Sequence, residues 1–282
     1  INTIFMKKTL TLLAIAVTLM TVSCSNDDSP ANLTKEVTGT YSGYTSASCA
    51  YFSGSMSADQ KVVISEGSSA NKVNVSYEST TWGTVSISDA TVGESAQGYI
   101  LSGSGKWSMG HNGNTSDYDC TFTGVIKSGE SQFTFSSPSV MGGLKVEFTE
   151  GEIPADLVIP GSYKGWTDAT CAYFQGMTAE NQIVTISVKD DKYSLAYTSD
   201  TWGEFSADDL KVTYSDGVFT LSGDGICKMG MNGNVSEYPC SVSGSVDVEK
   251  SSPAFVITVP GVMGGLKITF TNGDKPSEST NE

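Results

Sequence analysis

The feature that most constrains the fold is an internal duplication. The segment GTYSGYTSASCAYF at 39–52 recurs as GSYKGWTDATCAYF at 161–174. Further along, VMGGLKVEFT at 140–149 recurs as VMGGLKITFT at 262–271. The period of about 120 residues is too long for a solenoid repeat and matches a domain with its own core. The chain is therefore predicted to contain two similar domains in tandem.

The domain boundaries follow from the ends of the two copies. The linker GEIPAD begins at Gly151 and carries the proline and charges expected between domains. The predicted organisation is a first domain at 37–151, a second at 152–273 and a short disordered tail at 274–282.

Each copy is predicted to be all-β. Apolar and polar residues alternate strictly in Val73–Tyr77 and in Leu144–Phe148, and the corresponding parts of the second copy behave alike. This is the pattern of half-buried strands. Asn112-Gly113 and Gly142-Gly143 suit tight hairpin turns. About eight short strands per copy favour an antiparallel meander, as a barrel or a sandwich, and closure into a barrel removes exposed strand edges.

A short motif at the start of each copy resembles a known family. Residues 39–43 read GTYSG and residues 161–165 read GSYKG, a G-x-Y-x-G pattern. With the meandering strands, this is similar to the calycin-like β-barrel domains in lipoproteins of gut-type Gram-negative anaerobes. The resemblance implies two tandem calycin-like barrels. Because calycins hold small, mostly apolar ligands inside the barrel, it also implies a binding function. Lipocalins usually have Trp where Tyr41 and Tyr163 stand, so no ligand class is transferred.

The N-terminal segment has the layout of an export signal. Lys7 and Lys8 precede an apolar run that ends before Ser23-Cys24, which indicates a signal peptide at 1–23. The Ser-Cys end resembles a bacterial lipobox, and this implies cleavage before Cys24 and acylation of that residue, for instance with palmitate. The alternative is an ordinary signal peptide followed by a coincidental cysteine.

A polar tether is predicted at 24–36. Its acidic pair, Asp27-Asp28, resembles the surface-export signal of outer-membrane lipoproteins. We therefore expect a protein that is attached to the outer membrane by an N-terminal lipid and exposed at the cell surface. A periplasm-facing anchor is the alternative.

The charge of the chain argues against nucleic acid as a partner. Removing residues 1–23 leaves 14 Lys against 31 acidic residues, a mature net charge of 14 − 31 = −17, and the chain contains no Arg. Nucleic-acid binding depends mainly on basic residues that neutralise phosphates.

Four cysteines occupy matched places in the two copies. In an exported protein this pattern predicts the disulfides Cys49–Cys120 and Cys171–Cys240, with four buried thiols as the alternative. Cys227 has no matched cysteine and stands opposite Trp107 of the first copy. It is predicted to be a free buried thiol inside the second barrel, and the Trp-to-Cys change predicts two cavities of different size.

The sequence offers little for catalysis. The single histidine, His111, has Met231 as its counterpart, so a histidine-dependent triad or metal site cannot exist in both copies. The acidic residues Asp59 with Glu180 and Asp117 with Glu237 lie in polar stretches that favour surface solvation over hydrolysis. We therefore predict neither an enzyme nor a metal or cofactor site.

Aromatic residues are the better candidates for ligand contact. They could line a cavity for an apolar molecule or offer a stacking surface to a sugar, or simply fill the barrels as core. The candidate ligand-binding residues are Trp82, Trp202, Tyr44, Trp166, Tyr51, Tyr173 and Trp107.

Three functional hypotheses follow. The first is a lipoprotein whose two barrels each bind a small hydrophobic ligand. The second is a cell-surface protein with solid barrels that interacts with a glycan or a protein. The third is a carboxylate-dependent hydrolase. Cavity volume separates the first two, because ligand pockets measure roughly 300 Å³ or more.

Overall fold

The structure is a computed structural model that describes residues 32–111, 114–231, 234–250 and 252–276. The predicted signal peptide (1–23), the predicted lipidation site Cys24, and most of the tether lie outside the described residues. Within the described ranges, no helix has the length and apolar character needed to cross a bilayer.

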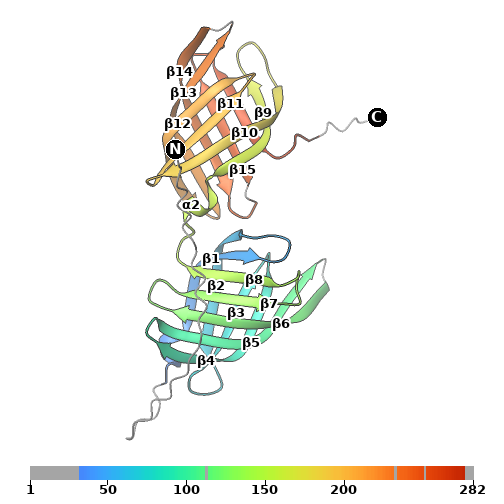
Figure 1. The fold of residues 1–282 in the computed structure, drawn as a ribbon, viewed down its shortest axis with the longest axis vertical. Helices are drawn as coiled ribbons and strands as arrows, with labels where there is room; N and C mark the ends of the chain where they lie inside the picture. Colours follow the sequence, from blue (N-terminus) through green and yellow to red (C-terminus); the bar gives the residue numbers. More distant parts are fainter. Residues whose placement is uncertain (1–31, 112–113, 232–233, 251, 277–282) are drawn as a thin grey trace, which may run out of the picture. The chain divides into compact units, whose positions relative to one another are not determined.

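The first copy folds as a closed antiparallel barrel in which each strand pairs with the next (Figure 1). The short helix α1 (Thr34–Val37) precedes it, and β1 pairs with β8 to close the ring, with Thr45 opposite Phe148. Its strands are β1 (Gly39–Ser48), β2 (Ser55–Glu66), β3 (Lys72–Ser79), β4 (Gly83–Ser95), β5 (Gly98–His111), β6 (Asn114–Ile126), β7 (Gln132–Ser137) and β8 (Leu144–Glu150).

The second copy repeats this topology after helix α2 (Ala155–Val158), and β9 pairs with β16 to close the barrel. Its strands are β9 (Gly161–Thr170), β10 (Met177–Lys189), β11 (Lys192–Ser199), β12 (Gly203–Ser215), β13 (Val218–Met231), β14 (Asn234–Asp247), β15 (Ser252–Val259) and β16 (Leu266–Asn272). The prediction of two tandem antiparallel barrels is confirmed.

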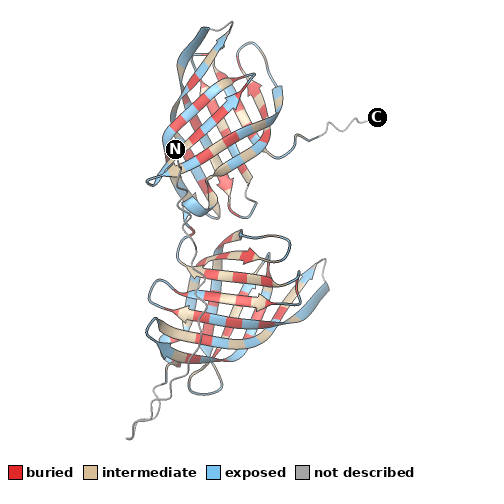
Figure 2. Ribbon diagram, in the orientation of Figure 1, coloured by how far each residue is buried: buried red, intermediate tan, exposed pale blue. Residues whose placement is uncertain are grey.

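Burial alternates along the strands, as the sequence pattern predicted (Figure 2). In β8, for example, Leu144, Val146 and Phe148 are buried, while the residues between them are more exposed. Side chains of one parity therefore fill the barrel and those of the other face outward.

The G-x-Y-x-G motif has a structural explanation in both barrels. The Tyr41 hydroxyl donates to the Val37 carbonyl (2.8 Å), and the Tyr163 hydroxyl donates to the Ile159 carbonyl (2.6 Å), so the tyrosine ties the preceding helix to the first strand. A Cβ on Gly43 would overlap the Thr149 carbonyl of β8, which explains the second glycine.

In an up-and-down barrel, every second connection between strands lies at the same end of the barrel. We call the end that carries the β1–β2, β3–β4 and β7–β8 connections the rim of barrel 1. Its loops are 49–54, 80–82 and 138–143, and the rim of barrel 2 has the loops 171–176, 200–202 and 260–265. Most of the matched sequence motifs, CAYF, TWG and VMGG, lie in these loops or next to them. The connections at the opposite end differ in sequence between the copies, and the β2–β3 and β6–β7 connections also differ in length from their counterparts.

Candidate functional site at the barrel rims

Aromatic side chains fill the interior of barrel 1. Tyr77 stacks on Phe135 with ring centroids 5.2 Å apart, and Phe133 packs against Phe148 at 5.5 Å. Trp107 is fully buried, and its indole Nε1 donates to the Trp82 carbonyl over 2.6 Å. These contacts form the core of a solid barrel.

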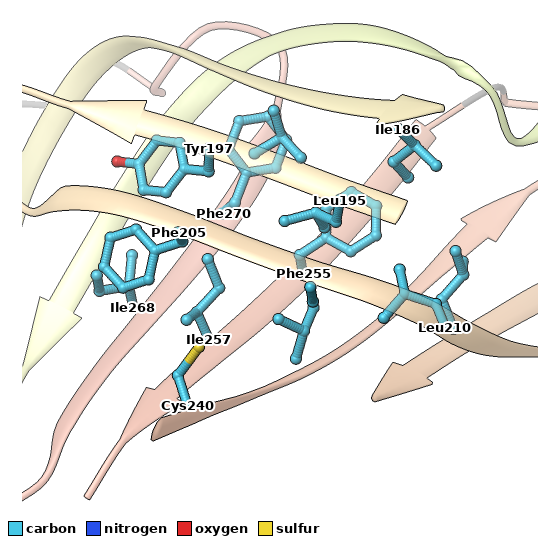
Figure 3. Packing of buried hydrophobic residues seen from close by; sticks show 14 of the residues in the cluster. Ile186, Leu195, Tyr197, Phe205, Leu210, Cys240, Phe255, Ile257, Ile268 and Phe270 are labelled. Atoms are coloured by element: carbon cyan, nitrogen blue, oxygen red, sulfur yellow. The ribbon is translucent and has the colours of Figure 1, made fainter. Parts of the chain in front are cut away.

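Barrel 2 has a different interior that is also filled. Val85 faces Trp107 across β4 and β5, whereas the same pair of positions in barrel 2 holds Phe205 and Cys227. Phe205 stacks on Tyr197 at 5.5 Å and lies among the buried side chains shown in Figure 3. The prediction that Cys227 lies inside the barrel is confirmed, since it is fully buried. The predicted size difference is offset, because the larger Phe205 faces the smaller Cys227.

Two hollows in the described parts of the chain lie outside the barrel interiors. One, of about 460 Å³, is open to solvent at the β4–β5 turn beside Tyr99. The other, of about 150 Å³, lies on the outer wall of barrel 2 beside Trp166 and Glu180. The structure therefore favours solid barrels over barrels that hold a drug-sized ligand.

The rim of each barrel is closed by a stacked aromatic pair. Phe52 stacks on Trp82 with centroids 5.6 Å apart, and Phe174 stacks on Trp202 at 5.9 Å. Trp82 and Trp202 are only 6% and 2% exposed. Gly83 has φ +77°, and a Cβ there would collide with the Ser108 carbonyl, so the TWG sequence places the indole over the barrel through a turn that requires glycine.

The rim loops make the same hydrogen bonds in both barrels, one within the β1–β2 loop and one that joins it to the β7–β8 loop. The Cys49 amide donates to the Phe52 carbonyl (2.9 Å), and the Ala50 amide donates to the Met141 carbonyl (3.3 Å). The equivalent distances in barrel 2 are 3.0 Å and 3.2 Å. Gly142 has φ +69°, and a Cβ on it would lie 2.8 Å from the Cβ of Ala50, so the loops pack closely. The matched motifs therefore build one rigid arrangement twice.

This arrangement exposes a tyrosine and a methionine. Tyr51 and Tyr173 are each 81% exposed, and Met141 and Met263 are 47% and 44% exposed. We call Tyr51 with Met141, and Tyr173 with Met263, the Tyr–Met tips.

The tip methionines have a strained backbone. Met141 has φ 48° and Met263 has φ 51°, in the left-handed region that costs a residue with a Cβ about 1–2 kcal/mol. Glycine would avoid this cost, yet both copies have methionine there. Strain at an exposed side chain that the core does not need points to a functional surface.

The structure scatters the candidate ligand-binding aromatics over three environments. Tyr44 and Trp166 lie on the outer faces of β1 and β9, where their neighbours Gly43 and Gly165 face inward. Tyr51 and Tyr173 lie at the tips. Trp82, Trp202 and Trp107 belong to the packed interior. They therefore do not form one ligand-binding cavity.

The predicted disulfides are not formed in the structure, in which Cys49, Cys120, Cys171, Cys227 and Cys240 are free thiols. Cys49 directly follows β1 and Cys120 lies on β6, and strands β7 and β8 lie between β1 and β6 in the barrel order. Three strand spacings amount to roughly 14 Å, whereas a disulfide needs Cα atoms within about 7 Å. Instead, the Cys49 thiol accepts the Tyr51 amide (3.3 Å), and the Cys171 thiol accepts the Tyr173 amide (3.3 Å), which gives the matched cysteines a role in the tip turns.

Burial makes Cys227 unreactive. Desolvation, with a smaller contribution from Cys240, raises the pKa of the Cys227 thiol to about 12. Since the thiolate is the nucleophile, this thiol should be inert at neutral pH.

The other residues that sequence reasoning considered for chemistry remain dispersed. The strand register aligns Gln60 with Gln182, so the counterpart of Asp59 is Asn181 and not Glu180. Asp117 and Glu237 are exposed. In the part of the chain that the structure describes, no group of three or more His, Cys, Asp or Glu residues is placed to hold a metal ion.

Sequence reasoning missed the tip methionines. It interpreted VMGG as a tight turn, and the exposure of Met141 depends on the conformation of that loop. The sequence did contain a signal, because VMGG is identical in both copies while neighbouring surface residues differ.

The comparisons with known proteins agree with this architecture. The family described as "Calycin-like beta-barrel domain" matches twice, over residues 37–149 and 159–273. No curated protein matches the chain.

Among solved structures, a putative outer membrane protein from Bacteroides fragilis is similar, with 24% identity and a TM-score of 0.54 over 86% of this chain and 99% of the other. This similarity shows the shared fold. A protein of unknown function from Nostoc punctiforme (10% identity, TM-score 0.24, 86% and 97% covered) is more distant. So is transferrin binding protein B from Neisseria meningitidis (10% identity, TM-score 0.23, 77% and 52% covered). Neither of these two is similar enough to inform function.

Proposed function

The chain belongs to the calycin-like β-barrel domain family, and from this premise we propose that it is a non-enzymatic cell-envelope protein that binds a glycan through its two Tyr–Met tips. The observation that carries the proposal is the presence of the same exposed Tyr–Met pair, in the same strained loop conformation, on both barrels. The core has no need of these side chains, and the loops around them are held by identical hydrogen bonds.

The size and chemistry of a tip suit a sugar. One tyrosine and one half-exposed methionine offer roughly 300 Å² at most, since an aromatic side chain contributes about 150–250 Å². A stable protein interface needs about 800 Å² from each partner. The two tip side chains carry no charge, so they suit an uncharged ring that stacks on the phenol and hydrogen-bonds to its hydroxyl. A single tip would bind weakly.

Two tips compensate for weak individual binding. When one tip is bound to a repeating glycan, the other binds at a high effective concentration, which can raise the overall affinity by about 10²–10⁴-fold. If both tips must bind the same repeating glycan, the two copies of the domain are expected to keep similar rims and to vary elsewhere.

The filled interior speaks against the hypothesis of a small hydrophobic ligand inside each barrel. A ligand of ordinary size would have to displace Trp82 and several buried aromatic side chains. The tip hypothesis requires no rearrangement of the core.

A location at the cell surface would place the tips within reach of glycans. It is supported by the signal-like N-terminus with Cys24 and by the description of the Bacteroides fragilis structure as an outer membrane protein. Lipid attachment at Cys24 is part of the proposal. Intact-mass analysis of the protein from its host should find acyl chains on this residue, and Cys24→Ala should release the protein from the membrane.

The binding proposal can be tested on a panel of immobilised bacterial and host polysaccharides by surface plasmon resonance. The protein should bind at least one polysaccharide on a dense surface. Tyr51→Ala or Tyr173→Ala should each weaken this binding by at least about 100-fold through loss of avidity, and the double variant should not bind. When the ligand is a short soluble oligosaccharide that occupies one tip, either single variant should bind about half as many ligand molecules per chain as the original protein.

Val63→Ala is the matched control, because Val63 is an exposed apolar residue on the wall of barrel 1 away from the rim. It should bind like the original protein. Full binding by the double tyrosine variant, or no binding of the original protein to any glycan, would refute the proposal.

A further inference from the structure

The β5–β6 hairpin of barrel 1 extends beyond the strands on either side of it (Figure 1). Strand β4 pairs with β5 as far as Ser108, and β7 pairs with β6 as far as Thr121. Residues 114–119 of β6 therefore have β5 on one side and, within the described ranges, no strand on the other. At about 3.3 Å per residue, this is an open strand edge roughly 20 Å long.

The loop that follows β7 turns away from this edge. It runs toward the β1–β2 loop, where the Met141 carbonyl accepts the Ala50 amide. At the end of β7, the Ser137 hydroxyl donates to the Asp119 carbonyl over 2.8 Å. Residues 114–117 and Asp119 are exposed (Figure 2). A further strand can therefore approach β6 from the side on which β7 has ended.

A proline in barrel 2 shows which backbone groups face the free edge. Pro239 occupies the position in β14 that corresponds to Asp119 in β6. Proline has no N–H, so within a sheet its nitrogen must face away from the paired strand. The matching register directs the N–H of Asp119 to the free edge, which agrees with the bond from Ser137 to its carbonyl. Because these groups alternate in direction along a strand, Thr115 and Asp117 also face the free edge.

The two barrels protect this edge differently. The hairpin sequences NGNTSDYDC at 112–120 and NGNVSEYPC at 232–240 are closely similar. In barrel 2, Pro239 removes a donor from the edge, and proline is one of the residues that natural sheets use to prevent edge pairing. Glu237 of the same strand forms a salt bridge with Lys228 (3.3 Å). Barrel 1 has Asp119 in place of the proline and keeps the donor. The edge is therefore blocked in barrel 2 and available in barrel 1.

Two aspartates determine the charge of the available edge. Asp119 forms a salt bridge with Lys106 of β5 (2.7 Å), yet its side chain is 90% exposed. Asp117 accepts a hydrogen bond from the Ser108 hydroxyl and has no lysine within salt-bridge distance in the described part of the chain. Like charges that face each other destabilise a strand pair, so two copies of this edge should repel each other. Cations at alternate positions of an incoming strand would instead face both aspartates.

We propose that residues 114–119 of β6 bind an extended segment of another protein as an added strand, with Lys or Arg at alternate positions. Main-chain hydrogen bonds to Thr115, Asp117 and Asp119 provide affinity, and cations opposite the two aspartates provide specificity. The residue between the cations lies on the same face as Tyr118, which is partly exposed, and is apolar. This proposal goes beyond glycan binding at the tips and uses a different surface, so either proposal can fail without the other.

Amide hydrogen exchange tests the edge before and after binding. In the free protein, the amides of Thr115 and Asp117 should exchange faster than those of Ser116 and Tyr118, which face β5. Saturation with the acetylated and amidated peptide Lys-Val-Lys-Val-Lys should slow the Thr115 and Asp117 amides by about tenfold or more. The amide of Val235, which corresponds to Thr115 in barrel 2, should not change. Absence of any slowing at Thr115 and Asp117 would overturn the proposal.

The peptide Lys-Lys-Lys-Val-Val is the matched control for charge. It has the same composition as the alternating peptide but cannot place a cation opposite each aspartate while it forms a strand. Fluorescence anisotropy with labelled peptides should show at least about tenfold tighter binding of the alternating peptide, a difference of about 1.4 kcal/mol. Equal binding of the two peptides would show that the protein responds to net charge alone and would contradict the proposal.

Exchange of the edge residue between the barrels tests the site directly. Asp119→Pro should weaken binding of the alternating peptide by about tenfold or more, because it removes a donor and a charge. Asp119→Asn keeps the donor and should lose only part of this affinity. Pro239→Asp should add a second site, so that two peptides bind per chain. Since barrel 2 accommodates proline in this register, Asp119→Pro should keep the original urea midpoint.

Two results with Asp119→Pro would contradict the proposal. One is unchanged peptide binding by a variant that keeps the original urea midpoint. The other is a dimer of the original protein, detected by sedimentation without peptide, that this substitution dissociates. Such a dimer would identify a second copy of the chain as the occupant of the edge.

Discussion

The two barrels share their strand order, their closure and their rims, but they fill their interiors differently. In barrel 1 a valine faces a tryptophan across two strands, and in barrel 2 a phenylalanine faces a cysteine. A second exchange surrounds the glycine at 103 and 223, where Ile87 with Ala90 becomes Ala207 with Leu210. The volume of the core is thus kept where its composition varies, whereas the rim keeps most of its residues. If the tips bind as proposed, the rims are a part of the duplication that function would hold constant.

The largest expected effect comes from transferring one half of the exchange. Trp107→Cys in barrel 1 should destabilise the protein by about 3–5 kcal/mol, because it opens a cavity and removes the hydrogen bond to the Trp82 carbonyl. Val85→Phe alone should overpack the core and cost about 1–3 kcal/mol.

The double variant should lose less stability than the two single variants together, and the difference should be at least about 1 kcal/mol. Urea unfolding under reducing conditions measures the cycle. Strict additivity would mean that the two positions do not compensate each other.

A smaller effect is expected at the contact between the rim loops. Gly142→Ala should destabilise barrel 1 by roughly 2 kcal/mol, because it combines left-handed strain with a clash against Ala50. Gly129→Ala is the control, since Gly129 has a similar φ of +73° with nothing within 4 Å. The difference between the two variants isolates the loop contact, and Gly264→Ala should reproduce it in barrel 2. Equal losses at Gly142 and Gly129 would show that the loops are not tightly packed.

Alkaline pH should affect the two barrels differently at the ends opposite their rims, where Tyr41 and Tyr163 lie. Burial, assisted by Glu150, raises the pKa of Tyr41 to about 12, whereas burial alone raises that of Tyr163. A pKa raised in the folded state means that the stabilisation is complete below pH 10, the ordinary tyrosine value, and is lost as the pH rises from about 10 to 12.

The loss from Tyr41 should be about 1 kcal/mol after allowance for solvent screening. Glu150→Asn, which introduces the residue found at the equivalent position in barrel 2, should lower the Tyr41 pKa measured by ultraviolet titration. An unchanged titration curve would exclude a role for Glu150.

The smallest effect on stability is expected at the tips. Met141→Gly relieves the left-handed strain but adds chain entropy to the unfolded state. The free energy of unfolding should therefore rise by at most about 1 kcal/mol and should not fall. Glycan binding on a dense surface should nevertheless fall as strongly as with Tyr51→Ala. A clear loss of stability would show that the methionine serves the fold.

Much of the architecture could be predicted from the sequence, because alternation and duplication are local patterns. Residues such as Leu144, Val146 and Phe148 identified a strand with one buried face, and the repeated turns indicated a closed meander. The matched CAYF and VMGG segments also showed where the two copies are most alike, and these segments form the rims.

What sequence reasoning could not supply was distance and register. Matched cysteines suggested disulfides, yet two strands separate Cys49 from Cys120. The loss of Trp107 in barrel 2 suggested a larger cavity, because nothing in the sequence shows that Phe205 faces Cys227. The exposure of Met141 depends on a left-handed backbone angle, which residue type alone would not have suggested.

The central claim is that binding takes place at the tips and not inside the barrels. It is tested most directly by methyl and indole NMR during titration with the glycan identified on the panel. The methyl signals of Met141 and Met263 should shift together, while the indole signal of the buried Trp107 stays unchanged. Shifts of the Trp107 indole without any change at the two methionines would place the ligand inside the barrel and contradict this account.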